Sequence, residues 1–209
     1  MEFAFTTHPA RKQDVVKFCE KAFKQGFTNI HIDFMDGKFS EEAASGVEEA
    51  KQIAKTLPQS KIFVHIMANK PKKWAKAFNK SLNCEIVFQI EAAKKPLKIL
   101  KKYGQGIAID LNTSIETIGS EVFEACKYVL VMLVKAGQSG QSQQTEALSK
   151  VVWLKEKYPH IKIVVDGGIN GTNLQPVIDT GADILSLGSF AYSLIENNNV
   201  KQFLTSHHK

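Results

Sequence analysis

Short apolar runs rich in β-branched and aromatic residues alternate along this chain with longer segments in which apolar residues recur at helical spacing. Continuous apolar runs of this kind are typical of strands that are buried on both faces of a sheet. The pattern predicts eight strands, at Phe3–Thr6, Asn29–Asp33, Lys61–Ile66, Glu85–Phe88, Gly106–Asp110, Tyr128–Leu133, Ile161–Asp166 and Ile184–Leu187.

Amphipathic segments between these runs predict helices, at Asp14–Lys24, Val47–Thr56, Lys72–Asn79, Thr145–Lys157 and Thr172–Thr180. Strands that alternate with helices favour a parallel sheet covered by the helices, and eight such units close naturally into an α/β (β/α)8 TIM barrel. An open doubly wound sheet is the alternative. No Pro-, Ser- or Gly-rich linker divides the 209 residues, so we expect one domain over residues 1–209.

Four polar residues stand at or near the carboxyl ends of three expected strands: His31 and Asp33, His65, and Asp166. His31 and Asp33 point to the same side of their strand because side chains alternate across it. A single strand histidine is more often a hydrogen-bonded core residue than a ligand. Two imidazoles with two carboxylates suit Zn²⁺, Fe²⁺, Mn²⁺ or Co²⁺ better than Ca²⁺, and a barrel would bring them together where an open sheet would not.

The charge and the cysteines narrow the class of partner. The formal net charge is +6, but Arg11 is the only arginine among the 27 basic residues, whereas nucleic-acid interfaces favour arginine. We therefore expect no nucleic acid, and an anionic small molecule suits the positive average. Cys19, Cys84 and Cys126 lie far apart in the sequence, which fits a protein of the reducing cytoplasm better than one held together by disulfides. The sequence shows neither the apolar core of a signal peptide nor an apolar stretch of roughly 18 residues. We therefore expect no membrane partner and a cytoplasmic protein.

Small residues follow the last three expected strands. Glycine lets backbone N–H groups approach an anion, and a helix N-terminus adds a favourable dipole. One glycine pair is more often a tight turn, but three at neighbouring strand ends predict the phosphate cradle usual in such barrels. The residues are Gly137, Gly140 and Gln141, then Gly167 and Gly168, then Gly188 and Ser189, which precede an expected helix at Phe190–Leu194.

Four motifs together resemble the ribulose-phosphate 3-epimerase family, in the family's order and over nearly the whole chain. They are His-Ile-Asp-Phe-Met-Asp-Gly-Lys-Phe at 31–39, Val-His-Ile-Met at 64–67, Val-Asp-Gly-Gly-Ile-Asn at 165–170 and Gly-Ala-Asp-Ile-Leu-Ser-Leu-Gly-Ser at 181–189. The resemblance implies a TIM barrel of the ribulose-phosphate-binding type, commonly a homo-oligomer. It also implies a metal-dependent 3-epimerase of a phosphosugar, most directly one that interconverts D-ribulose 5-phosphate and D-xylulose 5-phosphate.

The resemblance also implies residue roles. His31, Asp33, His65 and Asp166 would bind the divalent metal, and the two aspartates would act as acid and base in a two-base 1,1-proton transfer through a metal-stabilised enediolate. Independently of the family, epimerisation beside a ketone needs one proton removed from one face and another delivered to the opposite face, which two carboxylates can do. Thr6 falls at a substrate-binding hydroxyl, and Met35, Met67 and Met132 fall where the family covers its enediolate with thioethers. Asp36 is expected to cap the turn after its strand.

The chain departs from the family mainly in the loops that contact substrate. The family's Pro-Ser-Ile-Leu falls on Phe5-Thr6-Thr7-His8, a Val-Pro-Asn-type segment becomes Ser40-Glu41-Glu42-Ala43, and Gln89 stands where the family has a histidine. The loop that keeps Gly137, Gly140 and Gln141 otherwise differs from Pro-Gly-Phe-Gly-Gly-Gln. The new acids either alter sugar recognition or lie in solvent. The sequence therefore indicates the type of reaction more firmly than the identity of the sugar substrate.

Two other functions stay open. A 3-epimerase of a ketohexose 6-phosphate, such as allulose 6-phosphate, would use the same catalytic residues with altered loops. A non-catalytic phosphosugar-binding barrel would bind a ligand without proton exchange at C3. The orotidine-phosphate decarboxylases and hexulose-phosphate synthases resemble this chain in fold and phosphate grip, but their Asp-x-Lys-x-x-Asp signature is absent where Val64–Met67 stands. The identity of the metal is not fixed by this ligand set.

Overall fold

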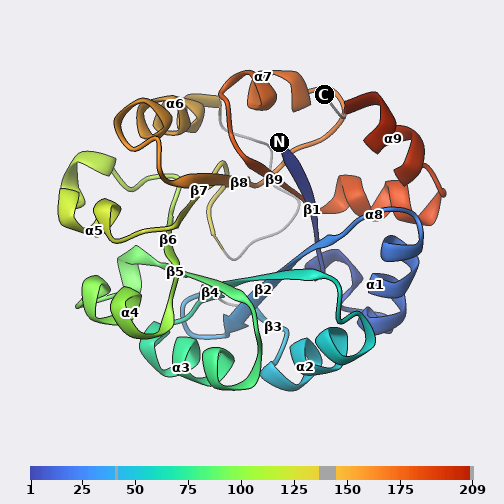
Figure 1. The fold of residues 1–209 in the computed structure, drawn as a ribbon, viewed down its shortest axis with the longest axis horizontal. Coiled ribbons are helices and arrows are strands. Elements are labelled where there is room, and N and C mark those ends of the chain that lie inside the picture. The colour runs from blue at the N-terminus through green and yellow to red at the C-terminus, as the bar shows by residue number, and fades with distance from the viewer. Residues whose placement is uncertain (41, 137–144, 208–209) are drawn as a thin grey trace.

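Eight parallel strands close into a barrel in the computed structural model, which describes residues 1–40, 42–136 and 145–207 (Figure 1). β1 pairs with both β2 and β9 and so closes the sheet, while the short β3 (Ala43–Ala44) lies antiparallel to the end of β2. The prediction of a (β/α)8 TIM barrel is confirmed. The barrel strands are β1 (Glu2–Thr6), β2 (Asn29–Asp36), β4 (Lys61–Met67), β5 (Glu85–Gln89), β6 (Gly106–Ile109), β7 (Tyr128–Met132), β8 (Lys162–Asp166) and β9 (Ile184–Leu187).

Helices surround the barrel on its outer face (Figure 1). They are α1 (Val15–Lys24), α2 (Val47–Thr56), α3 (Pro71–Ser81), α4 (Pro96–Tyr103), α5 (Ser120–Glu124), α6 (Leu148–Lys157), α7 (Leu174–Asp179), α8 (Ser189–Glu196) and α9 (Val200–His207). The sequence prediction did not include α4, α5 and α9, and α5, with five residues, is too short to develop a clear helical period. α1 begins after Asp14, whose carboxylate accepts the backbone N–H of Lys17 at 3.1 Å. No helix in the described part of the chain is both long and apolar enough to cross a membrane.

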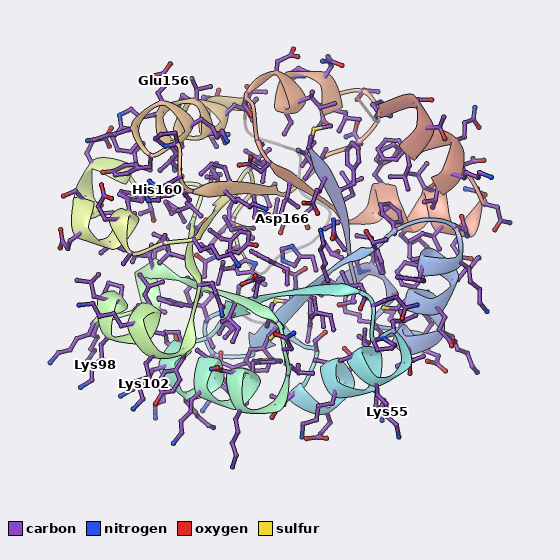
Figure 2. All side chains as sticks on the ribbon, viewed as in Figure 1. Lys55, Lys98, Lys102, Glu156, His160 and Asp166 are labelled. Carbon is purple, nitrogen blue, oxygen red and sulfur yellow. The ribbon has the colours of Figure 1, made fainter. Side chains whose placement is uncertain are left out.

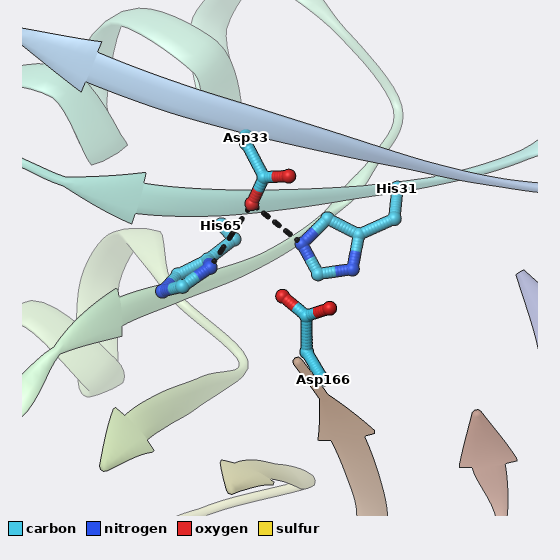
Figure 3. A group of neighbouring side chains, drawn as sticks. All are labelled: His31, Asp33, His65 and Asp166. Carbon is cyan, nitrogen blue, oxygen red and sulfur yellow. Dashed lines mark ion pairs between the residues drawn. The ribbon is translucent and has the colours of Figure 1, made fainter. Parts of the chain in front are cut away.

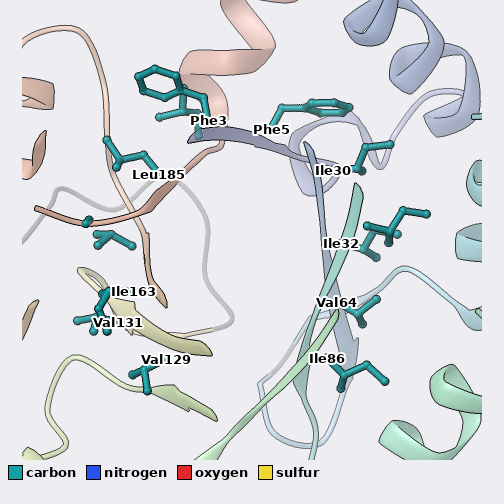
Figure 4. Packing of buried hydrophobic residues seen from close by; sticks show 14 of the residues in the cluster. Phe3, Phe5, Ile30, Ile32, Val64, Ile86, Val129, Val131, Ile163 and Leu185 are labelled. Atoms are coloured by element: carbon teal, nitrogen blue, oxygen red, sulfur yellow. The ribbon is translucent and has the colours of Figure 1, made fainter. Parts of the chain in front are cut away.

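Side-chain alternation along each strand separates an outer apolar layer from the inside of the barrel. On β2, Ile30 and Ile32 face the helices, whereas His31, Asp33 and Met35 take the alternate positions. Figure 4 shows the same outer layer on other strands, for example Val64 and Ile86 on one side and Val129, Val131 and Ile163 on the other. This layer, buried between sheet and helices, holds the strands in register.

A second apolar cluster fills the inside of the barrel below its mouth. Phe63, Tyr128, Leu130 and Val164 belong to it, and the rings of Phe63 and Tyr128 meet edge to face with centroids 5.5 Å apart. The barrel is therefore packed in its lower half. Polar side chains from the strands are left to gather at the mouth, above this packed layer.

We expect Gly106→Ala to destabilise the barrel by about 3 kcal/mol, because β6 and β7 leave no room for a side chain there. A Cβ atom at Gly106 would lie 2.0 Å from the carbonyl oxygen of Tyr128 on the paired strand, and neither backbone can move without losing ladder hydrogen bonds. The free energy of unfolding in urea measures this effect. Gly46→Ala is the matched control, since no atom lies within 4 Å of its added Cβ and a change below about 1 kcal/mol is expected. Equal losses in the two variants would contradict the close β6–β7 approach.

Candidate active site

Strand register brings the polar residues together at the mouth of the barrel. Asp33 on β2 pairs with His65 on β4, and His31 lies two residues earlier on the same face of β2. Asp166 at the end of β8 pairs with Met132 on β7 and with Ser186 on β9. Figure 2 places Asp166 in the middle of the ring of strands, whereas Lys55, Lys98 and Lys102 extend outward from the helices. Residues 133 positions apart in the chain, from Asp33 to Asp166, thus share one site.

His31, Asp33, His65 and Asp166 form a tight cluster (Figure 3). Oδ1 of Asp33 lies 3.2 Å from Nε2 of His31 and 3.3 Å from Nδ1 of His65. One potential ligand atom from each of the four residues lies within 4.8 Å of the others. Both histidines are fully buried, and the two aspartates are only 8% and 9% exposed.

The cluster fits a divalent cation. Nε2 of His31 and Nδ1 of His65 are buried, and among the described residues neither has a hydrogen-bond partner. Buried polar atoms without partners are costly and uncommon, and these two sit beside carboxylate oxygens in positions where a shared ion would satisfy them. Two nitrogen and two oxygen ligands suit Zn²⁺, Fe²⁺, Mn²⁺ or Co²⁺.

The ring nitrogens that face away from the cluster are held by polar side chains. Oγ of Ser186 lies 2.7 Å from Nδ1 of His31. The fully buried Gln89 amide, in the orientation that satisfies both of its ends, accepts the Nε2–H of His65 at 3.2 Å and donates to Glu91 at 2.7 Å and to the carbonyl of Ala108 at 3.2 Å. These contacts favour the neutral tautomers that leave Nε2 of His31 and Nδ1 of His65 free to bind an ion.

The two aspartates have opposite pKa shifts. Burial alone would raise the pKa of Asp33, but the rings of His31 and His65 outweigh it and hold that pKa below its ordinary value. Burial, reinforced by the charge of Asp33, raises the pKa of Asp166 to about 6, against the opposing influence of the histidines and Ser186. Burial lowers the pKa of His31, but the neighbouring carboxylates outweigh it and the pKa is raised.

A cavity of about 370 Å³ opens above this cluster. Its size suits a small phosphorylated metabolite. Most of the residues expected at the site line it together: Thr6, Asp33, Met35, Met67, Met132, Asp166, Gly167, Gly168, Gly188 and Ser189. His31 and His65 lie beneath it, while Gly137, Gly140 and Gln141 fall outside the described residues.

The two glycine loops also line the cavity. Gly167 and Gly168 have φ values of +119° and +65°, which residues other than glycine disfavour. A Cβ at Gly167 would lie 2.6 Å from the side chain of Val134. Gly188 is the N-cap of α8 and Ser189 its first residue, so backbone N–H groups without helical acceptors border the cavity.

Other contacts were missed or only partly anticipated. His8 lines the cavity, and Ser186 supports His31, although neither was assigned a role from the sequence. The signal for Ser186 was available, since it lies two residues before Gly188 in a quoted motif. Gln89 was singled out only as a departure from the family. The expectation for Asp36 is confirmed, because its Oδ1 accepts the backbone N–H groups of Lys38 and Phe39 at 3.0 and 3.1 Å.

We expect Asp166→Asn to stabilise the metal-free protein at pH 8 by about 1–3 kcal/mol. The folded-state pKa of Asp166 is raised from 3.8 to about 6, so the ionised carboxylate is disfavoured in the fold, and this penalty develops between pH 4 and 6. Asparagine cannot ionise, and the difference from the unmodified protein should vanish at pH 4. Urea unfolding in chelator at both pH values measures it. Asp33→Asn should have the opposite sign at pH 8, because the pKa of Asp33 is lowered. A destabilised Asp166→Asn at pH 8 would contradict this assignment.

We expect Gln89→Leu to weaken metal binding about 10–100-fold, since it removes the acceptor that orients His65. Competition against a chromophoric chelator measures the affinity directly. Gln175→Leu is the matched control, because Gln175 is exposed on α7 and its amide donates to Asp179 at 2.7 Å, far from His65 in the chain. Unchanged affinity in Gln89→Leu would remove Gln89 from the support of the site.

Comparisons with known proteins agree with the geometry. The model of the family described as "Ribulose-phosphate 3 epimerase family" matches residues 3–192. A protein named ribulose-phosphate 3-epimerase from Eremothecium gossypii is 28% identical over 200 residues, covering 89% of this chain and 84% of the relative. A protein of the same name from Methanocaldococcus jannaschii is 33% identical, covering 81% of this chain and 75% of the relative.

Solved structures with the same fold include 3-hexulose-6-phosphate synthase from Salmonella typhimurium, with a TM-score of 0.63 and 16% identity over the whole of both chains. Phosphoribosyl anthranilate isomerase from Thermus thermophilus has a TM-score of 0.65 and 14% identity, also over the whole of both chains. At such identities these likenesses show the barrel alone. The sequence relatives and the family match show more, and the chain belongs to the ribulose-phosphate 3-epimerase family and is an isomerase.

Proposed function

We propose that this protein is a metal-dependent 3-epimerase that interconverts D-ribulose 5-phosphate and D-xylulose 5-phosphate. The observation that carries the proposal is the pair of buried carboxylates, Asp33 and Asp166, which point toward one another from β2 and β8 beside two histidines (Figure 3). The relatives named ribulose-phosphate 3-epimerase support a pentose phosphate as substrate. A relative from Oryza sativa, 25% identical and named a cytoplasmic isoform, supports a cytoplasmic location.

The two carboxylates supply the proton transfers. Of the two carboxyl groups in the metal-free protein, Asp33 has the lowered pKa and Asp166 the raised one, so Asp33 is the more readily ionised and Asp166 the one that more readily holds a proton. Asp33 takes the C3 proton, and the electrons of the C–H bond move into C2–C3 to form an enediolate. Asp166 then delivers its proton to the opposite face of C3 and restores the ketone. The reverse reaction exchanges the two roles.

His31, Asp33, His65 and Asp166 would hold the divalent ion, which when bound supplies positive charge beside the substrate carbonyl and stabilises the negative charge that develops there. Ser186 and Gln89 keep the two histidines in the orientation that this requires. The chain's own contribution is thus a rigid set of ligands built on strands of the barrel.

Three thioethers line the cavity near these groups, from Met35, Met67 and Met132. Methionine sulfur is polarisable and offers no acidic proton, so it can cover the reacting carbons without competing with the aspartates. Their burial, at 4% exposure or less, also keeps water away from the carbanionic carbon.

The glycine loops would bind the phosphate group. Residues Gly167 and Gly168, and Gly188 with the first residues of α8, line the cavity with their backbone. A phosphate held there accepts hydrogen bonds from the backbone and lies at the positive end of the α8 dipole. With the phosphate bound by these loops, the sugar chain would extend toward the cluster of histidines and aspartates.

Proton NMR in D₂O tests the proposal. Metal-loaded protein should exchange the C3 proton of D-ribulose 5-phosphate for solvent deuterium and form D-xylulose 5-phosphate. A chelator should stop both reactions. Exchange only with allulose 6-phosphate would instead establish the ketohexose 6-phosphate epimerase. Binding without exchange of any ketose phosphate would favour the non-catalytic phosphosugar-binding barrel.

We expect Asp33→Asn and Asp166→Asn each to lower epimerisation by about 10³-fold, because each variant loses the proton carrier for one face. Each retains one carboxylate, so C3 exchange from one of the two epimers should outlast epimerisation. The same NMR assay reads both quantities, with metal content measured alongside. Asp179→Asn, on the exposed surface of α7, should behave as the unmodified protein. Near-normal epimerisation in either site variant would contradict the two-carboxylate mechanism.

A further inference from the structure

Two departures from the family pattern, at His8 and Glu42, meet at the rim of the cavity. His8 begins the short 3₁₀ helix η1 (His8–Ala10) after β1, and Glu42 lies between β2 and β3. Nε2 of His8 lies 3.2 Å from Oε2 of Glu42, and Nη2 of Arg11 lies 3.5 Å from the same oxygen. Arg11 also donates from Nη1 to the carbonyl of His8 at 3.3 Å. Glu42, one of the two acids that the sequence places near the mouth, therefore does not simply lie in solvent, whereas Glu41 falls outside the described residues.

His8 is a buried polar side chain with unused hydrogen-bonding capacity. It is 7% exposed, and it lines the same cavity as Thr6 and Asp33. Both of its ring nitrogens, Nδ1 and Nε2, are buried without a geometrically formed hydrogen bond among the described residues, but Nε2 lies within ion-pair distance of Glu42 whereas Nδ1 has no such neighbour there. Burying an unpaired ring nitrogen is unfavourable unless something in the cavity completes it. The leucine of the family's Pro-Ser-Ile-Leu segment, which falls at this position, has no polar atom that needs a partner.

The ring in this setting is a neutral hydrogen-bond acceptor. Burial lowers the pKa of His8, and the Arg11 charge acts in the same direction, against the opposing charges of Asp33 and Glu42. A neutral imidazole whose Nε2–H faces the Glu42 carboxylate has its lone pair on Nδ1. An acceptor nitrogen needs a donor as its partner. A sugar hydroxyl is such a donor, whereas a phosphate dianion is not.

We propose that His8 is a specificity-determining residue that accepts, at Nδ1, a hydrogen bond from a hydroxyl group of the ketose phosphate, and that Glu42 positions its ring. This inference rests on the proposed function for the class of ligand. It assigns the sugar chain, rather than the phosphate, to this part of the cavity wall. A site that hydrogen-bonds a substrate hydroxyl discriminates strongly against analogues that lack it, because its own polar atom is then left unpaired.

Binding to the metal-loaded protein tests the inference. Calorimetry with D-ribulose 5-phosphate should give a dissociation constant about tenfold higher for His8→Leu, as expected for one lost hydrogen bond, and about threefold higher for Glu42→Gln. Inorganic phosphate, which offers no hydroxyl donor of the sugar chain and is assigned to the glycine loops, should bind all proteins equally. His8→Gln keeps an acceptor and should recover part of the affinity. His160→Leu and Glu124→Gln are the matched controls, since this exposed pair lies 3.9 Å apart outside the cavity.

Each outcome of these binding experiments either supports or overturns the inference. Unchanged ketose-phosphate binding in His8→Leu would overturn the inference. Equal weakening of ketose phosphate and inorganic phosphate would also overturn it, because His8 would then merely hold the loops together. If the unmodified protein binds D-ribulose 5-phosphate without C3 exchange, the proposed function fails while the binding comparison still decides the role of His8. If it binds neither this sugar nor allulose 6-phosphate, both proposals fail.

Discussion

The register between β2 and β4 is the constraint on which the site depends. Asp33 lies opposite His65, and Met35 lies opposite Met67, because the parallel ladder from Asn29 to Met35 runs without a bulge. A shift of one residue would turn His31 and Asp33 toward the helices and Ile32 into the barrel. The apolar residues of the outer layer, such as Ile30 and Val64, therefore select the register that also builds the polar cluster. On these two strands, the register that stabilises the fold is therefore also the register that assembles the site.

The buried cluster is unfavourable in isolation and is stabilised by its surroundings. Four ionisable side chains lie in a largely water-excluded mouth, where the histidines outweigh the effect of burial on the Asp33 carboxylate but not on the Asp166 carboxylate. Ser186 and Gln89 satisfy the outward ring nitrogens, but the inward ones are satisfied only when a ligand or ion is shared among them. The packed layer of Phe63 and Tyr128 below prevents the cluster from relaxing inward.

The eight strands and the chemistry at their ends could be predicted because both follow local rules. Runs of β-branched residues mark the strands, and the spacing of His31 and Asp33 fixes their common face. Contacts between distant loops could not be predicted this way. No periodicity relates His8 to Glu42 or Ser186 to His31, since each pair is joined by barrel closure. Among the helices that were missed, α5 is too short to show a helical period, whereas the apolar residues of α4 do recur at helical spacing and could have been recognised.

Catalytic and recognition residues have different mechanical support in this barrel. Asp33, His65 and Asp166 are carried by paired strands, where a substitution in one strand disturbs its neighbours. His8 and Glu42 lie outside the barrel ladder, so they can change without altering the register that holds the metal ligands. The sugar contact can therefore diverge while the proton carriers stay in place. An apolar residue exchanged for His8 alone would remove the shorter of the two ion-pair contacts of the Glu42 carboxylate and leave it Arg11 at 3.5 Å, so the histidine and the acid support each other there.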